Sequence, residues 1–224
     1  MNERLIGRAG FLGLLGAGTA GLFYGSNVQG FLGRVVPQQI QALVPTAGWR
    51  IYTIGDSMPN LVPASYRLDV TGMVGSAKRF TLADLRALPR ADQVSDFHCV
   101  TGWTVGNVHW GGVRIQDVLD VVRPSAAAHA IRFTSAEPGY NDSLTLDQAL
   151  LKDVMLAYEM DGAPLPRPHG APIRLVIPEM YGYKNVKWIT KMELLPHPEA
   201  GYWEQHGYDV DAWVGRSNGY ASSA

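Results

Sequence analysis

The sequence predicts an α+β domain with mixed sheets and short helices, and three observations lead to that class. Short apolar or alternating segments that are typical of strands recur along the chain. Two or three short helix patterns lie among them, without the regular strand–helix alternation of a doubly wound sheet. The chain has 224 residues, 46% hydrophobic and 17% charged, which is ordinary for one globular domain with a sizeable core.

Residues 1–34 are predicted to form an apolar helix that serves as an export signal or a membrane anchor. Arg4 and Arg8 come first, and no charged residue lies between Arg8 and Arg34. Signal peptides carry a basic start and an apolar core, whereas a membrane span needs about 20 apolar residues. A cleaved signal and a retained anchor both remain open. Either predicts a location outside the cytoplasm, in the periplasm or on the outer face of the cytoplasmic membrane.

Three further units follow this segment. Residues 35–65 contain four prolines and few periodic apolar residues, so they are predicted to be an irregular lead-in that lies over the domain. Residues 66–200 carry the strand and helix patterns and form the predicted domain. Residues 201–224 are rich in glycine, tyrosine and tryptophan, and are predicted to be a coil whose aromatic side chains pack on the domain.

The first half of the domain begins with a strand at residues 66–70. Thr81 is predicted to cap a short helix at residues 82–88, because Asp84 stands at the third helical position. A strand at residues 94–100 carries Cys99 at its end. Gly111 and Gly112 predict a turn before a helix at residues 115–122.

The second half contains mainly strands. Asp161-Gly162 is a favourable hairpin dipeptide. Further strands are predicted at residues 130–134, 155–158, 173–177 and 186–195.

Cys99 is the only cysteine, so it cannot form an internal disulfide. Such a thiol is either a buried, inert side chain or a reactive or metal-bound sulfur. A zinc site is a weak alternative, because one cysteine with scattered histidines does not supply the usual four ligands. A Cys/His nucleophile pair, with His109 or His169 as the base, also stays open. The polar and aromatic neighbours that surround the thiol in the sequence are His98, Thr101, Trp103, Asn107, His109 and Trp110.

A second cluster lies about seventy residues downstream. Arg174, Lys184 and Lys187 supply three cations near His169, and Gly182 stands in a turn whose backbone donors could form a nest. Such groups suit a phosphate or another buried anion, although a basic face in solvent is the plainer interpretation. The formal net charge is −1 and the lysines and arginines are otherwise scattered, which argues against nucleic acid as a partner.

The two clusters together resemble the sulfite oxidase superfamily of molybdopterin-dependent oxidoreductases. The similarity extends over roughly residues 49–198. It rests on Pro59-Asn60-Leu61, Pro63 and Tyr66-Arg67-Leu68-x-Val70-x-Gly72 at the domain start, Cys99-Val100-Thr101-Gly102-Trp103 with Trp110-Gly111-Gly112-Val113, His169-Gly170-x-Pro172-x-Arg174, and Gly182-x-Lys184-x-x-Lys187-Trp188.

The resemblance implies a sulfite-oxidase-type molybdopterin-binding domain that holds one molybdenum–molybdopterin cofactor per chain. Cys99 would be the thiolate ligand of the metal, which is sensible for a soft ligand on a transition metal. The catalytic pocket would contain Cys99, Trp103, His109 and Trp110. The cofactor would be bound by Tyr52, Thr53, Cys99, Ser135, His169, Arg174, Asn185, Val186 and Lys187.

The subtype follows from departures from that pattern. Sulfite oxidases place arginines near the metal, whereas the matching positions here are Thr53 and residues 101–104, with no arginine among them. The chain also ends about where a dimerisation domain would begin, so no such domain is expected. It is most similar to the catalytic subunit of the bacterial periplasmic methionine sulfoxide reductase.

The expected activity is therefore two-electron oxygen-atom transfer that reduces an S-oxide or N-oxide, on a small molecule or on a protein. A membrane haem protein or another electron-transfer partner would supply the electrons. Two alternatives stay open. One is a sulfite dehydrogenase whose anion-binding arginine is Arg114, Arg132 or Arg216, and the other is a non-catalytic anchored subunit of a membrane complex.

Overall fold

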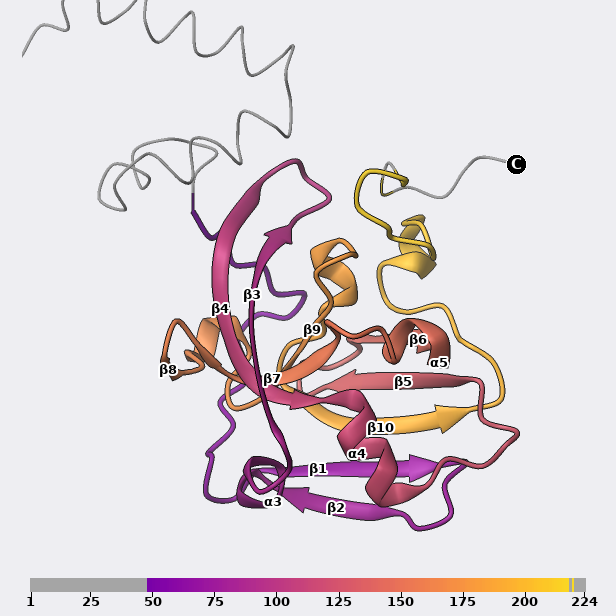
Figure 1. The fold of residues 1–224 in the computed structure, drawn as a ribbon. Coiled ribbons are helices and arrows are strands. Elements are labelled where there is room, and N and C mark those ends of the chain that lie inside the picture. Colours follow the sequence, from indigo (N-terminus) through magenta and orange to yellow (C-terminus); the bar gives the residue numbers. More distant parts are fainter. Residues whose placement is uncertain (1–47, 218, 220–224) are drawn as a thin grey trace, which may run out of the picture.

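The computed structural model of the chain describes residues 48–217 and 219. These residues form two five-stranded sheets with a few short helices (Figure 1), as predicted for an α+β domain. The predicted helix at residues 1–34 and the first part of the lead-in, residues 35–47, lie outside the described residues. Within the described part, no helix is both long and apolar enough to cross a membrane.

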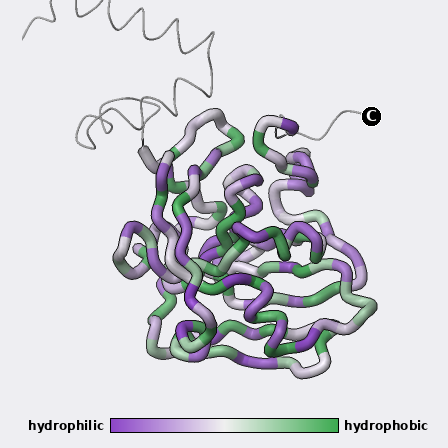
Figure 2. The backbone as a smooth tube through the Cα atoms, in the orientation of Figure 1, coloured by the Kyte–Doolittle hydropathy of each residue, from purple (hydrophilic) through white to green (hydrophobic). Residues whose placement is uncertain are grey.

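The first sheet has the strand order β2-β1-β10-β5-β6. Its first and last strands in the sequence, β1 and β10, pair in parallel, and the other neighbours are antiparallel, so the sheet is mixed. Hydrophobic and hydrophilic stretches alternate along its strands (Figure 2), as expected when one face of a sheet is buried. The strands are β1 (Arg67–Gly72), β2 (Lys78–Thr81), β5 (Ala130–Ser135), β6 (Asn141–Thr145) and β10 (Ile189–Leu195).

The second sheet is antiparallel and has the order β3-β4-β7-β8, with β9 paired to β7. Strands β3 and β4 form a long hairpin whose tip lies beside the C-terminal segment (Figure 1). That tip contains Cys99, so the hairpin carries the cysteine to the C-terminal segment. The strands are β3 (Arg90–His98), β4 (Thr104–Arg114), β7 (Met155–Met160), β8 (Ala163–Pro164) and β9 (Arg174–Val176).

The helices are short and well capped. The Asp84 backbone N–H donates to Thr81 Oγ1 over 3.0 Å, and the Thr81 N–H donates to Asp84 Oδ2 over 2.8 Å. This confirms the predicted cap, although the helix ends two residues earlier than expected. The helices are α3 (Leu82–Arg86), α4 (Ile115–Val122) and α5 (Leu146–Ala149), with 3₁₀ turns η1 (Arg167–His169), η2 (Gly182–Lys184) and η3 (Glu204–His206).

The main core joins the first sheet, α4 and buried residues of the second sheet, among them Val113 of β4, Leu156 of β7 and Leu175 of β9. Ile115, Val118, Leu119 and Val122 of α4 are all buried, which confirms the helix that their spacing predicted. They belong to one apolar cluster with the inward-facing residues of β1, β5 and β10. Burial of each such side chain stabilises the fold by about 1.5–3 kcal/mol.

The predicted turn at Gly111-Gly112 is wrong, because both glycines lie within β4. β4 is paired on both sides there, and the register shifts by one residue between the two glycines on the side of β7. A Cβ atom on Gly112 would lie 2.1 Å from the Leu156 carbonyl oxygen and 2.8 Å from Ala157 Cα. These glycines therefore permit a close approach of two strands rather than a chain reversal.

Other boundaries also differ from the prediction. The strand predicted at residues 94–100 begins at Arg90 and ends at His98, so Cys99 starts the turn that follows. Only the last part of the strand predicted at residues 186–195 is β10. Strands β2, β4 and β6 were not predicted. β6 has the polar sequence NDSLT, and its buried polar side chains hide the strand pattern.

Candidate active site

A cavity of about 300 Å³ lies at the tip of the β3–β4 hairpin. The lead-in, the hairpin tip, the segment from η1 to Lys187 and the C-terminal segment all contribute to its walls. Its size is at the lower end of the range for small-molecule sites. The lining residues include Trp49, Arg50, Tyr52, Thr53, Phe97, Cys99, Thr101, Trp103, Glu137, Tyr140, His169, Arg174, Tyr183, Asn185, Lys187, Trp203 and Tyr208.

Cys99 is held in a tight turn at the hairpin tip. The Cys99 N–H donates to the Trp103 carbonyl over 2.9 Å, and the Gly102 N–H donates to the Cys99 carbonyl over 3.0 Å. Gly102 has a φ of 87°, a conformation that favours glycine. Cys99 Sγ lies 3.2 Å from Thr101 Oγ1. The turn thus presents a half-buried thiol to the cavity.

Aromatic rings form the wall next to this turn. The Trp49 ring lies 4.9 Å from the Phe97 ring and 6.2 Å from the Trp103 ring, measured between centroids. The Tyr52 ring lies 6.5 Å from that of Trp103. Trp103 is itself buried, and its indole Nε1 has no hydrogen-bond partner among the described residues.

Arg174 supplies a buried positive charge. Its guanidinium carbon lies 5.4 Å from the centroid of Phe97 and 5.2 Å from that of Trp110. Its nitrogens donate to the carbonyls of Leu175 over 3.3 Å and of His169 over 3.2 Å. Within the described residues no carboxylate pairs with it, and burial lowers the pKa of Arg174 to about 10. A cation so placed favours an anion in the cavity.

Lys187 and His169 lie on the same wall. Lys187 Nζ donates to the Tyr52 carbonyl over 2.6 Å. Burial, aided by the charge of Arg174, lowers the pKa of Lys187 to about 8, so the ammonium stays mostly charged at pH 7. Burial and the charges of Arg174 and Lys187 lower the pKa of His169 to about 4, so its ring is neutral. The buried His169 Nδ1 has no partner among the described residues.

Glu137 belongs to this site, although the sequence did not point to it. Its buried carboxylate accepts from the Ile54 N–H over 2.6 Å, from the Gly55 N–H over 3.1 Å and from the Thr53 hydroxyl. Three donors on one short stretch of the lead-in therefore converge on a single acid. Glu137 and Lys187 together hold the lead-in against the cavity, which places Tyr52 and Thr53 in its lining.

The remaining predicted site residues lie in different surroundings. Ser135 donates its hydroxyl to the Lys187 carbonyl over 2.8 Å and so braces the wall from behind. Asn185 lines the cavity, and its Oδ1 accepts from the Ile177 N–H over 2.7 Å. Val186 is buried in the core. His109 is exposed and Trp110 is buried behind Arg174; neither of these two lines the cavity within the described residues.

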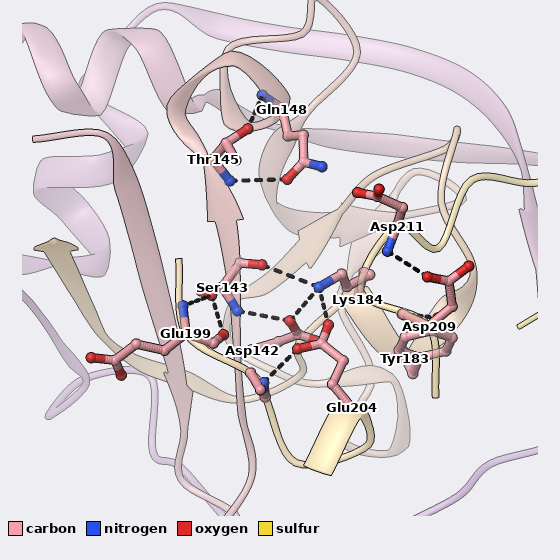
Figure 3. A network of polar contacts seen from close by, with 12 residues as sticks. Asp142, Ser143, Thr145, Gln148, Tyr183, Lys184, Glu199, Glu204, Asp209 and Asp211 are labelled. Carbon is pink, nitrogen blue, oxygen red and sulfur yellow. Dashed lines mark hydrogen bonds and ion pairs between the residues drawn. The ribbon is translucent and has the colours of Figure 1, made fainter. Parts of the chain in front are cut away.

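Lys184 was predicted to contribute charge to the anion site, and that prediction is wrong. Lys184 is not among the lining residues of the cavity. Its ammonium group lies in a buried cluster with Asp142 and Glu204 (Figure 3). Lys184 Nζ donates to Asp142 Oδ1 over 2.7 Å, to the Ser143 carbonyl over 3.2 Å and to Glu204. Burial raises the pKa of Asp142 to about 7. Burial lowers the pKa of Lys184, but the two carboxylates outweigh that effect and raise it overall.

This cluster ties the C-terminal segment to the domain. Glu204 belongs to η3, and its Oε2 accepts from the Gly201 N–H over 2.5 Å. The neighbouring Trp203 lines the cavity. The ion cluster therefore fixes one wall of the site without touching its contents.

Lys184→Met is expected to destabilise the protein by about 3–5 kcal/mol, because it leaves two buried carboxylates without their cation. Chemical denaturation of the wild type and the variant measures the difference in the free energy of unfolding, provided that this free energy falls with denaturant concentration at the same slope in both proteins. The control is Lys191→Met, which removes an ion pair with the partly exposed Glu193 and should cost no more than about 1 kcal/mol. Equal effects of the two substitutions would contradict a central role for Lys184.

Comparisons with known proteins agree with this geometry. The family model of the oxidoreductase molybdopterin binding domain matches residues 55–203. The chain belongs to this family.

The molybdopterin-binding family includes relatives of several kinds. "Uncharacterized oxidoreductase YuiH" of Bacillus subtilis is 32% identical, over 81% of this chain and 90% of that protein. "Putative protein-methionine-sulfoxide reductase subunit YedZ1" of Azospira oryzae is 33% identical, over 87% and 74%. Sulfite oxidase of Arabidopsis thaliana is 31% identical, over 65% and 46%. The sulfane dehydrogenase SoxCD of Paracoccus pantotrophus shares the fold, with a TM-score of 0.60 and 23% identity over 63% of this chain and 41% of that chain.

This membership makes the chain an oxidoreductase of the sulfite oxidase superfamily with a molybdenum–molybdopterin cofactor. It also sets aside the alternative of a non-catalytic subunit. A zinc centre gains no support, since no cluster of three or more His, Cys, Asp or Glu suited to a metal occurs in the described part of the chain.

The residues of the cavity fit a molybdopterin cofactor. The buried Arg174 and the cationic Lys187 suit its phosphate. His169 Nδ1, which has no hydrogen-bond partner in the described part of the chain, offers a buried polar contact. A single thiol stands at the hairpin tip of the same cavity, where a soft metal ligand is needed. The cavity therefore offers the groups that this cofactor requires. Positive charge suits its phosphate, and the thiol suits its metal.

Proposed function

We propose that this protein reduces an uncharged S-oxide or N-oxide by two-electron oxygen-atom transfer. The observation that carries the proposal is the neutral surroundings of the thiol. Phe97, Val100, Thr101 and Trp103 flank Cys99 and line the cavity with it, and none bears a charge. A buried oxyanion such as sulfite needs charge-assisted partners, whereas a neutral oxide suits an apolar wall. The similarity to the YedZ1 protein of Azospira oryzae agrees with this direction.

In this proposal each part of the site has a separate role. Cys99 binds the metal through its thiolate, and Trp103 shapes the space where the oxide enters. His169, Arg174, Asn185 and Lys187 hold the pterin and its phosphate, with Tyr52 and Thr53 of the lead-in closing the cavity. When bound, the cofactor supplies two-electron oxygen-atom transfer. We do not assign His109 or Trp110 to the reaction, because they lie outside the cavity lining.

The overall reaction needs an external electron donor. Cleavage of the sulfur–oxygen bond of an S-oxide, or of the nitrogen–oxygen bond of an N-oxide, consumes two electrons and two protons and releases the reduced substrate and water. We propose that a membrane haem protein or a similar electron carrier supplies the electrons outside the cytoplasm. Support comes from the uncharged, largely apolar stretch between Arg8 and Arg34 of the sequence and from the YedZ1 relative, which is named as a subunit.

Sulfite oxidation is the second candidate, and Arg50 is the observation that favours it. Arg50 is an exposed arginine of the lead-in that lines the cavity. The arginines proposed from the sequence do not serve this purpose. Arg114 bonds to Gln93, Arg132 pairs with Glu193 and Glu199, and Arg216 stacks on Trp213.

Steady-state kinetics of the cofactor-loaded protein distinguish the two candidates. Methionine sulfoxide and trimethylamine N-oxide are assayed with a reduced viologen dye, and sulfite with an oxidising dye. We expect turnover of an oxide to exceed that of sulfite, and Arg50→Gln to leave oxide reduction within about threefold of the wild type, because a neutral oxide needs no cation there.

Arg216→Gln is the matched control, since Arg216 is an exposed arginine outside the cavity lining. The opposite result would establish sulfite dehydrogenase instead. In that case the wild type would oxidise sulfite faster than it reduces an oxide, and Arg50→Gln would lower sulfite oxidation about 10–100-fold, the effect of one charge-assisted hydrogen bond.

A further inference from the structure

The hydroxyl of Thr101 is the polar group that contacts the sulfur of Cys99. The two atoms lie 3.2 Å apart, within hydrogen-bond distance for sulfur. Both residues belong to the tight turn closed by the Cys99–Trp103 and Gly102–Cys99 backbone bonds. The contact is therefore made within five consecutive residues, 99–103, and does not depend on distant packing.

The direction of this hydrogen bond follows from the state of the sulfur. A thiol and a hydroxyl can each donate, but a metal-bound thiolate has no hydrogen and can only accept. With Cys99 as a metal ligand, the hydrogen must come from Thr101. Other polar groups of the turn are engaged or lie elsewhere. Thr104 Oγ1 lies 3.0 Å from His98 Nδ1, and within the described residues no second side chain is hydrogen-bonded to the sulfur.

We infer that Thr101 is a positioning residue that donates a hydrogen bond to the metal-bound sulfur of Cys99 and raises the reduction potential of the metal. The inference rests on the proposed role of Cys99 as the ligand. Hydrogen bonds to ligand sulfurs are a recognised means by which proteins set the potential of a metal centre. A donated hydrogen bond withdraws electron density from the thiolate, so the thiolate stabilises the oxidised metal less and reduction becomes easier.

Three variants test this role. Thr101→Val keeps the branched shape but removes the donor, whereas Thr101→Ser keeps the donor. Thr104→Val is the matched control, because it removes a neighbouring hydroxyl that contacts His98 rather than the sulfur. Each protein is loaded in a cofactor-competent host, and its molybdenum and pterin contents are measured before the potential is determined by redox titration with electron paramagnetic resonance.

We expect all three variants to hold molybdenum at the wild-type level. Thr101→Val should lower the potential and move the thiolate-to-metal charge-transfer band to lower energy. Thr101→Ser keeps the donor, so its potential and its charge-transfer band should lie close to those of the wild type. Thr104→Val should leave the potential and the band unchanged.

An unchanged potential and band in a metal-loaded Thr101→Val protein would overturn the inference while the proposed function stands. An equal shift in Thr104→Val would also overturn it, because the effect would then belong to the turn as a whole. Absence of molybdenum from the wild-type protein would overturn the ligand assignment, and the inference with it.

Discussion

Cys99→Ser protein is expected to lose oxide reduction completely, to below the detection limit of the dye assay, while the domain stays folded. The substitution replaces the soft thiolate by a hard oxygen at the position proposed to bind the metal. The change in shape is small, and Cys99 is only half buried in a turn. The melting temperature should therefore stay within about 4 °C of the wild type, which corresponds to about 1 kcal/mol.

The spectrum gives a second measurement that activity alone does not. The thiolate-to-metal charge-transfer band should be absent from Cys99→Ser, even where pterin remains bound. Val100→Ala is the matched control, because it alters the same turn next to the thiol without changing a polar atom. Wild-type turnover in Cys99→Ser, or equal loss in Val100→Ala, would refute the assignment of Cys99 as the ligand.

Arg174→Met should abolish retention of the cofactor. Arg174 presents several donors from a fixed guanidinium plane, and each charge-assisted bond to a phosphate contributes about 1.5–3 kcal/mol. Loss of two such bonds would weaken binding by about 10²–10⁴-fold. Pterin and molybdenum remaining after gel filtration measure the effect, and we expect less than a tenth of the wild-type content.

Arg167→Met is the control for this substitution. Arg167 is also an arginine of this wall segment, but it donates to the carbonyls of Pro59 over 3.0 Å and of Met58 over 2.5 Å and does not line the cavity. Its substitution should leave the cofactor content unchanged. If Arg174→Met retained the cofactor as fully as Arg167→Met, the phosphate site would have to lie elsewhere.

Local patterns in the sequence predicted local structure well. The Thr81–Asp84 cap and the apolar spacing of α4 both involve residues within one or two turns, and the structure has both. Gly111 and Gly112 misled the prediction because a glycine pair can permit either a turn or a close approach of strands. Only the partner strand β7 decides between them, and its position is not a local property of the sequence.

Site residues that belong to a sequence motif could be predicted, whereas those that reach the cavity from distant segments could not. Cys99, Trp103, His169, Arg174 and Lys187 were all predicted, and the cavity brings them together. Glu137, Trp49 and Trp203 were missed, since each reaches the cavity through a contact with a segment far away in the sequence. Lys184 was misassigned for the same reason, as nothing near it in the sequence indicates that Asp142 and Glu204 enclose its ammonium group.

The parallel pairing of β1 and β10 determines when the domain can be completed. Asp69 of β1 lies opposite Lys191 of β10, so about 120 residues of chain must be synthesised between the two partners. Until then β1 has only β2 beside it, and its other edge is a row of unpaired backbone groups. Closing so long a loop is slow. The nascent chain therefore passes through a long period with an open sheet edge, which only the last strand closes.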